Sequence, residues 1–109
     1  MRQPLVAGNW KMNGTAASID VLMAGIKHGL ADVKTAAVVV CPPFVYIAKV
    51  AELAKGSKIG VGSQDISDQE SGAFTGEISG PMLKDTGCQY AIVGHSERRA
   101  IYGESDAFT

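Results

Sequence analysis

Residues 36–41 read Ala-Ala-Val-Val-Val-Cys, and Pro42-Pro43 follows this apolar run at once. β-Branched residues favour strands, and proline ends a strand that lies inside a sheet. A half-exposed strand would alternate apolar and polar residues, whereas this run is apolar on both faces. Such strands belong to parallel sheets with both faces covered. The run therefore predicts an α/β fold built on a parallel sheet.

Similar runs and helical stretches extend on both sides of this strand. Strands are predicted at residues 5–8, 36–41, 58–63 and 89–93, and helices at residues 18–30, 44–54 and 79–85. A short helix can follow His95, and a further helix start is expected at Ser105-Asp106. The order is β-α-β-α-β-α-β. Strands that alternate with helices are joined by right-handed crossovers into a parallel sheet.

The first helix is predicted from an apolar stripe at helical spacing. The stripe consists of Ile19, Leu22, Met23, Ile26 and Leu30. Ser18 can cap the N-terminus, and Asp20 is expected in the first turn, where the helix dipole favours an anion. Lys27 and His28 fall near the end, where the dipole favours a cation. We expect the stripe to pack in the core and His28 to lie at the surface.

The composition limits the class of protein. Of the 109 residues, 46% are apolar and 19% are charged, which is enough to bury a core and too little charge for disorder. The net charge of −1 implies no basic face for nucleic acid, and no apolar run approaches the ~20 residues of a membrane span. The first eight residues do not form a signal peptide. We expect Cys41 and Cys88 to be buried thiols in a reducing compartment, not a disulfide or a metal site.

Polar side chains follow the first and the last predicted strand. Asn9 and Lys11 follow the first, and His95 and Glu97 follow the fourth. Parallel α/β proteins build active sites at the C-terminal ends of their strands. If the extended conformation continues past the first strand, Asn9 and Lys11 project to one side and Trp10 to the other. The set can offer a cation, hydrogen-bond donors and a titratable ring to a small anionic substrate.

A plainer interpretation of residues 94–99 remains open. They can form a surface loop in which Ser96 caps a helix and the Glu-Arg-Arg sequence is simply solvated. The fourteen residues from Gln64 to Glu77 show no clear period and include Gly72, Phe74 and Gly76. Loops of that length are functional or disordered.

Familiar cofactor motifs are not found in the sequence. There is no Gly-x-Gly-x-x-Gly after the first strand and no Gly-x-x-x-x-Gly-Lys-Ser/Thr. The two histidines have no metal-ligand spacing to the cysteines. The serine next to His95 does not by itself make a catalytic triad, because triad members are neighbours in space.

Three motifs in order resemble the triosephosphate isomerase family. They read Gly-Asn-Trp-Lys-Met-Asn-Gly at residues 8–14, Ser-Gly-Ala-Phe-Thr-Gly-Glu at residues 71–77, and Gly-His-Ser-Glu-Arg-Arg at residues 94–99. The resemblance covers all 109 residues. It implies a (β/α)8 TIM barrel that interconverts dihydroxyacetone phosphate and glyceraldehyde 3-phosphate in glycolysis and gluconeogenesis. It also implies no cofactor, a homodimer, and a cytoplasmic location.

The resemblance also implies roles for four residues. Lys11 is similar to the substrate-binding lysine, whose cation offsets the phosphate and the developing enediolate charge. Asn9 is similar to the asparagine that hydrogen-bonds the substrate near its reacting oxygens. His95 is similar to the catalytic electrophile, for which this family is a known example of a neutral imidazole that polarises a carbonyl. Glu97 is similar to the carboxylate beside the lysine, which is often given a proton-relay role.

A second group of residues resembles the family's dimer interface. Thr75, at the tip of the long loop, is similar to the residue that reaches into the neighbouring subunit beside Asn9 and Lys11. Arg98 is similar to a residue that helps to hold that interface. The interface set expected from the resemblance is Phe74, Thr75, Gly76, Glu77 and Arg98. The resemblance therefore favours a dimer clamp over a disordered loop.

The resemblance further implies that residues 1–109 are the N-terminal portion of the barrel domain. Such a barrel takes ~250 residues, and four of its eight strands are predicted here. The family's glutamate base, its lid and its later phosphate-binding turns do not occur in the sequence. General-base catalysis contributes on the order of 10²–10⁴ in rate, so the 109-residue chain alone is expected to be inactive. The alternative is a non-catalytic α/β fragment that self-associates through its open edges.

Overall fold

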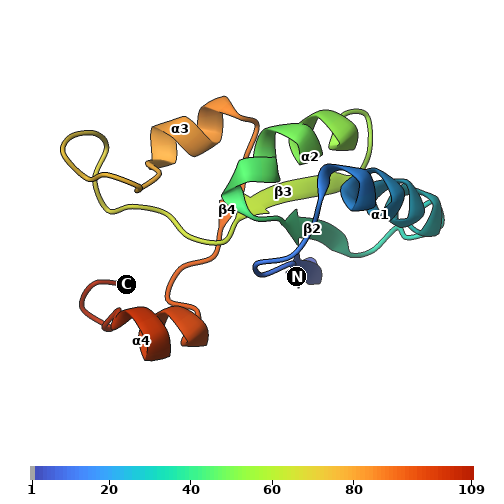
Figure 1. Cartoon of the computed structure of the whole chain (residues 1–109). Helices are drawn as coiled ribbons and strands as arrows, with labels where there is room; N and C mark the ends of the chain where they lie inside the picture. Colours follow the sequence, from blue (N-terminus) through green and yellow to red (C-terminus); the bar gives the residue numbers. More distant parts are fainter. Residues whose placement is uncertain (1) are drawn as a thin grey trace.

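The computed structural model describes residues 2–109, which form one parallel sheet with helices between the strands (Figure 1). The strands are β1 (Leu5–Asn9), β2 (Ala37–Cys41), β3 (Ile59–Ser63) and β4 (Tyr90–Ala91). The helices are α1 (Ala16–Gly29), α2 (Ile47–Ala54), α3 (Gly80–Asp85) and α4 (Ser96–Tyr102), with a 3-10 turn η1 (Phe44–Tyr46) before α2. The element order and the parallel pairing confirm the α/β fold predicted from the sequence.

The strands lie in the order β1-β2-β3-β4 and share their direction. Asn9 pairs with Cys41 at the C-terminal ends of β1 and β2. β3 pairs with β2 through Val61 and Val40, and β4 joins β3 where Ser63 meets Ala91. The residues that follow the strands therefore leave the sheet at one common edge.

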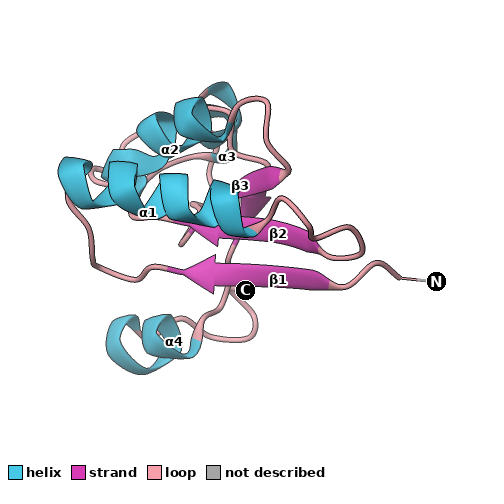
Figure 2. Ribbon diagram, turned by 90° about the vertical axis from the view of Figure 1, so that its right-hand side faces the viewer, coloured by secondary structure: helices cyan, strands magenta, loops and turns pink. Residues whose placement is uncertain are grey.

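The core lies between the sheet and the helices α1, α2 and α3, which gather on one side of the sheet (Figure 2). Its buried side chains come from both layers: Ile19, Met23, Ile47, Val50, Ala54 and Leu83 from the helices, and Val40, Ile59 and Val61 from the strands. Burying one large aliphatic side chain contributes about 1.5–3 kcal/mol. This layer holds the strands in place beneath the loops that carry the polar residues.

The opposite face of the sheet has no helix layer along its length, and α4 lies on that side (Figure 2). Val39 and Cys41 of β2 are nevertheless buried there. Tyr90 lies across the neighbouring glycines, since a Cβ at Gly60 would be 3.0 Å from the ring carbon Cε2 of Tyr90. A Cβ at Gly62 would be only 2.8 Å from Sγ of Cys41. The glycines of β3 thus leave the space that neighbouring side chains occupy.

The predicted N-cap of the first helix was wrong by three positions. Thr15, not Ser18, is the N-cap of α1, and the two form a capping box. The Ser18 amide donates to Oγ1 of Thr15 at 3.1 Å, and the Thr15 amide donates to Oγ of Ser18 at 2.9 Å. Asp20 therefore lies beyond the first turn, where it pairs with Lys49 of α2 at 3.0 Å. Leu22, predicted in the buried stripe, is 44% exposed.

The fourth strand is shorter and more exposed than predicted. The sequence placed a buried strand at residues 89–93, whereas β4 contains Tyr90 and Ala91 and both are exposed. β4 is an edge strand, so one side of it has no neighbour in the described part of the chain. One further bond from the Ile92 amide to the Ser63 carbonyl, 2.9 Å long, extends the pairing. Gly94 then turns the chain away with φ of +61°.

Other predictions about the chain have a mixed outcome. Cys41 and Cys88 are free and buried, as expected. Ser105 accepts a hydrogen bond from the Phe108 amide, but only a single turn follows it within residues 2–109. In the same residues, no helix is long and apolar enough to cross a membrane, and no three His, Cys, Asp or Glu side chains group around a possible metal position.

The capping box leads to a prediction about stability. Replacing Thr15 by alanine removes the side-chain oxygen that accepts the Ser18 amide, and we expect the free energy of unfolding to fall by about 1 kcal/mol. Chemical denaturation monitored by circular dichroism measures this change. Thr35→Ala, at an exposed position outside the helices, is the matched control. Equal stability of the two variants would contradict the role of the cap.

The sheet edges lead to a second prediction. β1 and β4 are the edge strands, and Leu5, Val6 and Tyr90 on them are about half exposed. Unpaired edges with apolar side chains promote association between chains. We therefore expect the purified 109-residue chain to self-associate in sedimentation velocity at micromolar concentration. A monomer that melts cooperatively under those conditions would contradict this expectation.

Candidate active site

A half-open cleft of about 590 Å³ lies at the edge of the sheet where the strands end. Asn9 and Lys11 line it from the end of β1, and His95 and Glu97 line it from the start of α4. The structure thus brings together the four residues that the sequence predicted as a set. Two of them follow β1 and two follow β4, which are the outermost strands on opposite sides of the sheet.

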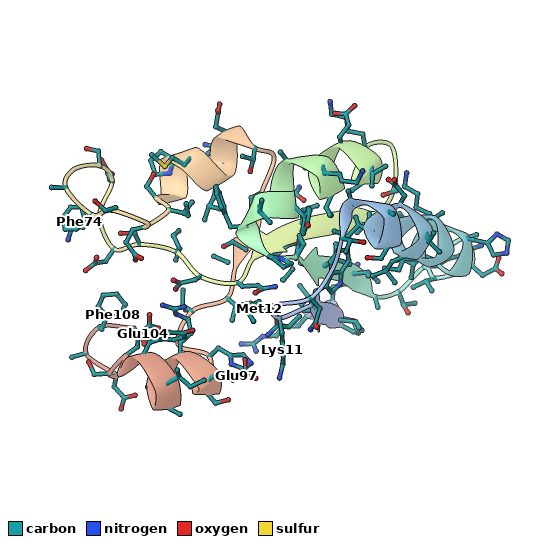
Figure 3. All side chains as sticks on the ribbon, in the orientation of Figure 1. Lys11, Met12, Phe74, Glu97, Glu104 and Phe108 are labelled. Atoms are coloured by element: carbon teal, nitrogen blue, oxygen red, sulfur yellow. The ribbon has the colours of Figure 1, made fainter. Side chains whose placement is uncertain are left out.

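Lys11 and Glu97 form an ion pair in the lining of this cleft. Nζ of Lys11 donates to Oε1 of Glu97 at 2.6 Å, and the two side chains point toward each other in Figure 3. The hydrogen bond from Lys11 lowers the pKa of Glu97. The side chains are 52% and 46% exposed, so the pair contributes little to stability. Its effect is to fix where the ammonium group of Lys11 lies.

The backbone of Lys11 has an unusual conformation. Its φ is +54°, the only positive φ at a residue other than glycine among residues 2–109. The extended conformation, on which the predicted directions of Asn9, Trp10 and Lys11 depended, therefore does not continue past β1. The side-chain oxygen Oδ1 of Asn9 accepts the Lys11 amide at 2.9 Å, which closes a tight turn. Trp10 packs against the core.

The same turn orients Asn9. Because Oδ1 accepts the Lys11 amide, the amide nitrogen Nδ2 is the end of Asn9 left to act on a bound molecule. Asn9 is half-buried and lines the cleft. It therefore offers hydrogen-bond donors next to the ammonium group of Lys11.

His95 is the N-cap of α4, and its two ring nitrogens have different roles in this geometry. Its Nδ1 accepts the backbone amide of Glu97 at 3.0 Å. With Nδ1 as the acceptor of this hydrogen bond, Nε2 is the ring nitrogen that can donate. The Nε2–H group is then the donor of this ring. The geometry is suited to polarising an oxygen atom without placing a second cation in the cleft.

Arg98 also lines the cleft and belongs to a charged cluster. Its Nε donates to Glu104 at 2.8 Å, its NH2 group lies 3.2 Å from Asp65, and its guanidinium lies 4.8 Å from the ring centre of Tyr102. Burial opposes the charge on Arg98, but Glu104 and Asp65 raise its pKa. Burial raises the pKa of Asp65. The cluster joins α4 to the loop after β3.

The loop after β3 is ordered by its own hydrogen bonds. The backbone amide of Ser67 donates to the Ile78 carbonyl at 2.8 Å, and the backbone amide of Glu77 donates to the Phe74 carbonyl at 2.9 Å. Gly76 and Glu77 line the cleft, whereas Phe74 is 46% exposed at the outer end of the loop, far from Lys11 (Figure 3). Thr75 is also exposed. The disordered alternative for this loop is therefore wrong, and its interface role remains a prediction.

A model of the family described as triosephosphate isomerase matches residues 4–109. The chain belongs to the triosephosphate isomerase family. It is 58% identical over 106 residues to the triosephosphate isomerase of Methylococcus capsulatus, which covers 97% of this chain and 42% of the relative. The relative from Alcanivorax borkumensis is 56% identical, with 97% and 41% covered. That from Nitrosococcus oceani is 52% identical, with 98% and 43% covered.

The chain thus spans about two fifths of the length of the curated isomerases that it matches. Four parallel strands with their helices correspond to the first half of the TIM barrel, as the resemblance implied. The motifs at residues 8–14 and 94–99 carry the four polar residues of the cleft.

Sequence reasoning missed three residues in and around this cleft. Gln64 donates from its amide nitrogen to the Lys11 and Cys41 carbonyls, and Asp65 and Glu104 hold Arg98. Gln64 directly follows β3, so its place after a strand was the available signal. No comparable signal marked Glu104 in the sequence. It lies after the end of α4, six positions from Arg98.

The Lys11–Glu97 contact leads to a prediction about pH. Glu97 has a lowered pKa in the folded chain, so its pairing stabilises the fold above its ordinary pKa, and this contribution is lost as pH falls through the lowered value. In Lys11→Met, NMR titration of the Glu97 carboxyl should give a pKa closer to the ordinary value. Lys49→Met, which removes the pair with Asp20, is the control and should leave Glu97 unchanged. An unchanged pKa in Lys11→Met would contradict the contact.

Proposed function

We propose that residues 1–109 are the N-terminal portion of a TIM-barrel domain and supply half of the active site of a triosephosphate isomerase. The reaction is the interconversion of dihydroxyacetone phosphate and glyceraldehyde 3-phosphate by proton transfer through an enediolate. The observation that carries the proposal is one cleft that holds an ammonium group, an amide donor and an imidazole whose Nδ1 accepts a backbone amide. The family match supports the same reaction.

Lys11 and Asn9 bind the substrate in this proposal. A triose phosphate is a small dianion, and the ammonium group of Lys11 attracts it to the cleft. As a proton leaves carbon, negative charge develops on the substrate oxygens, and a fixed cation with hydrogen-bond donors stabilises that charge. Because Asn9 and Lys11 are held in one turn, little reorganisation is needed when the charge forms.

His95 is the electrophile in this proposal. Its Nε2–H donates to the carbonyl oxygen of the substrate and stabilises the enediolate, while Nδ1 stays hydrogen-bonded to the Glu97 amide. Glu97 keeps Lys11 in position and can relay a proton. The proton on carbon is removed by a base outside these residues. No cofactor takes part, because proton transfer next to a carbonyl needs none.

The proposal includes a partner and a location. The complete enzyme is a cytoplasmic homodimer, and the loop that carries Phe74, Thr75, Gly76 and Glu77 contacts the neighbouring subunit beside Asn9 and Lys11. The exposure of Phe74 at the end of an ordered loop supports this contact. Arg98 contributes by holding the base of that loop through Asp65.

The second candidate is a non-catalytic fragment that associates through its sheet edges. The half-exposed apolar side chains on β1 and β4 favour it for the isolated chain. It excludes isomerase activity of the 109 residues alone and is compatible with activity in a completed barrel.

A chimera tests the isomerase. This chain replaces the matching 106 residues of the Methylococcus capsulatus relative, and turnover is measured in a coupled assay. We expect an active chimera and no appreciable activity from the 109-residue chain. His95→Gln in the chimera should lower kcat by about 10²–10³, with a much smaller change in KM, since its donor acts on transition-state charge.

His28→Gln is the matched control, because His28 lies near the end of α1 and outside the cleft. An inactive but folded chimera, or a loss in His95→Gln confined to KM, would contradict the proposal. Turnover by the 109-residue chain near that of the chimera would contradict its inactivity.

A further inference from the structure

A depression of about 350 Å³ lies at the other end of the sheet from the cleft. Its volume is within the range of pockets that bind small molecules. The last turn of α1, the turn after α2 and Ile59, the first residue of β3, surround it. A helix between two parallel strands returns the chain to the start of the next strand, so this depression lies at the N-terminal ends of the strands. It shares no lining residue with the candidate active site.

Three lysines and no carboxylate line this depression within residues 2–109. They are Lys27 in the last turn of α1, Lys55 at the end of α2 and Lys58 just before β3. Nζ of Lys58 donates to the Val33 carbonyl at 3.2 Å, which holds the ammonium group in place and leaves it further N–H donors. Lys55 contacts Glu52 at 2.8 Å, but the two side chains are 75% and 72% exposed, so this ion pair is weak. The depression is therefore positively charged in a chain whose net charge is −1.

The floor of the depression is apolar. Ile59 is 6% exposed, Leu30 is half-buried against the core, and Ala31 lies beside them at the rim. An inorganic anion would leave this floor in contact with water, whereas a ligand with a flat apolar group would cover it. The chemistry that fits the depression is therefore an apolar group joined to more than one negative charge.

Neighbouring elements of this chain form both sides of the depression. α1 and α2 lie on the same side of the sheet (Figure 2), and Asp20 of α1 contacts Lys49 of α2 at 3.0 Å. β2 and β3 are directly paired. The edge strands are β1 and β4, so the further strands of a TIM barrel would join there and not between α1 and α2. The depression is therefore expected to stay open in a complete barrel.

We propose that this depression is a binding site for a nucleoside diphosphate. The base covers the apolar floor, and the phosphate groups lie between the ammonium groups of the three lysines. A phosphate oxygen takes the place of Glu52 on Lys55, which costs little because that ion pair is exposed. Pyrophosphate carries the charge without the apolar group, and a nucleoside carries the apolar group without the charge. The site is separate from the isomerase reaction and does not depend on it.

The chimera described above tests this site in a complete barrel. All lining residues fall between Lys27 and Ile59, so the whole depression comes from this chain. Binding of ADP, pyrophosphate and adenosine is measured by isothermal titration calorimetry at low ionic strength. We expect ADP to bind more tightly than either of its parts, and added salt to weaken its binding. Equal affinities for ADP and pyrophosphate, equal affinities for ADP and adenosine, or no binding of ADP would each overturn the proposal.

Variants of the lysines place the bound ADP. Lys27→Met and Lys58→Met should each weaken ADP binding about two- to fivefold, as expected for exposed ion pairs, and the double variant should weaken it further. Lys27→Arg keeps the charge and should keep the affinity. Lys84→Met removes the same charge from α3, outside the depression, and is the matched control. An equal loss in Lys84→Met would show attraction by overall charge only and would overturn the proposal.

Kinetics separates this site from the cleft. ADP bound in the depression should leave KM for the triose phosphate unchanged, whereas ADP bound beside Lys11 would raise it by competition. Lys58→Met should leave kcat and KM of the chimera unchanged. Competition by ADP, together with binding that Lys27→Met and Lys58→Met do not weaken, would overturn the proposal.

The titrations need a folded chimera, shown by cooperative melting, and not an active one. An inactive but folded chimera therefore contradicts the isomerase proposal and leaves the ADP test intact. If the joint prevents folding, the 109-residue chain is co-expressed with the remaining residues of the relative, and the same titrations decide.

Discussion

The structure depends on the common direction of its strands. In a parallel sheet all C-terminal ends lie at one edge, so the residues after each strand emerge together whatever their distance in sequence. Asn9 and Lys11 leave β1 at this edge, Gln64 leaves β3, and His95 follows β4. β1 and β4 are not neighbours in the sheet. The long Lys11 side chain and the start of α4 bridge the remaining distance, and Lys11 meets Glu97 across 86 positions of sequence.

Much of the fold could be predicted from local patterns in the sequence, because each strand is a short apolar run and each helix has its own stripe or cap. The errors have physical causes. Thr15 and Ser18 are both capable N-caps, and only their reciprocal hydrogen bonds decide which one begins α1. The run from Gln89 to Val93 is apolar enough for a buried strand, but an edge position and the turn at Gly94 limit β4 to two residues. The amino-acid composition of a segment does not show whether the strand will lie at the edge or in the middle of a sheet.

The residues of the site could be predicted from the sequence, whereas their geometry could not. Asn9, Lys11, His95 and Glu97 follow strands, and that rule alone groups them. The rule does not predict that Lys11 has positive φ, because its conformation results from contacts with side chains elsewhere in the chain. It also does not predict that His95 accepts a hydrogen bond at Nδ1, which depends on how α4 begins. Gln64 obeyed the same rule and was overlooked as one polar residue at the start of a long loop.

The packing of the Tyr90 ring on Gly60 and Gly62 of β3 affects the position of His95. β4 is short, and bonds from the Gln89 and Ile92 amides to the carbonyls of Val61 and Ser63 extend its pairing with β3. A shift by one residue would turn every side chain of β4 to the opposite face. The space above Gly60 and Gly62 accepts the ring of Tyr90 in the observed alignment. In a shifted alignment, Ala91 would leave that space empty and Tyr90 would meet the helix layer. The space at Gly60 and Gly62 thus favours one register of β4. The register of β4 in turn affects the position of His95, five residues after Tyr90.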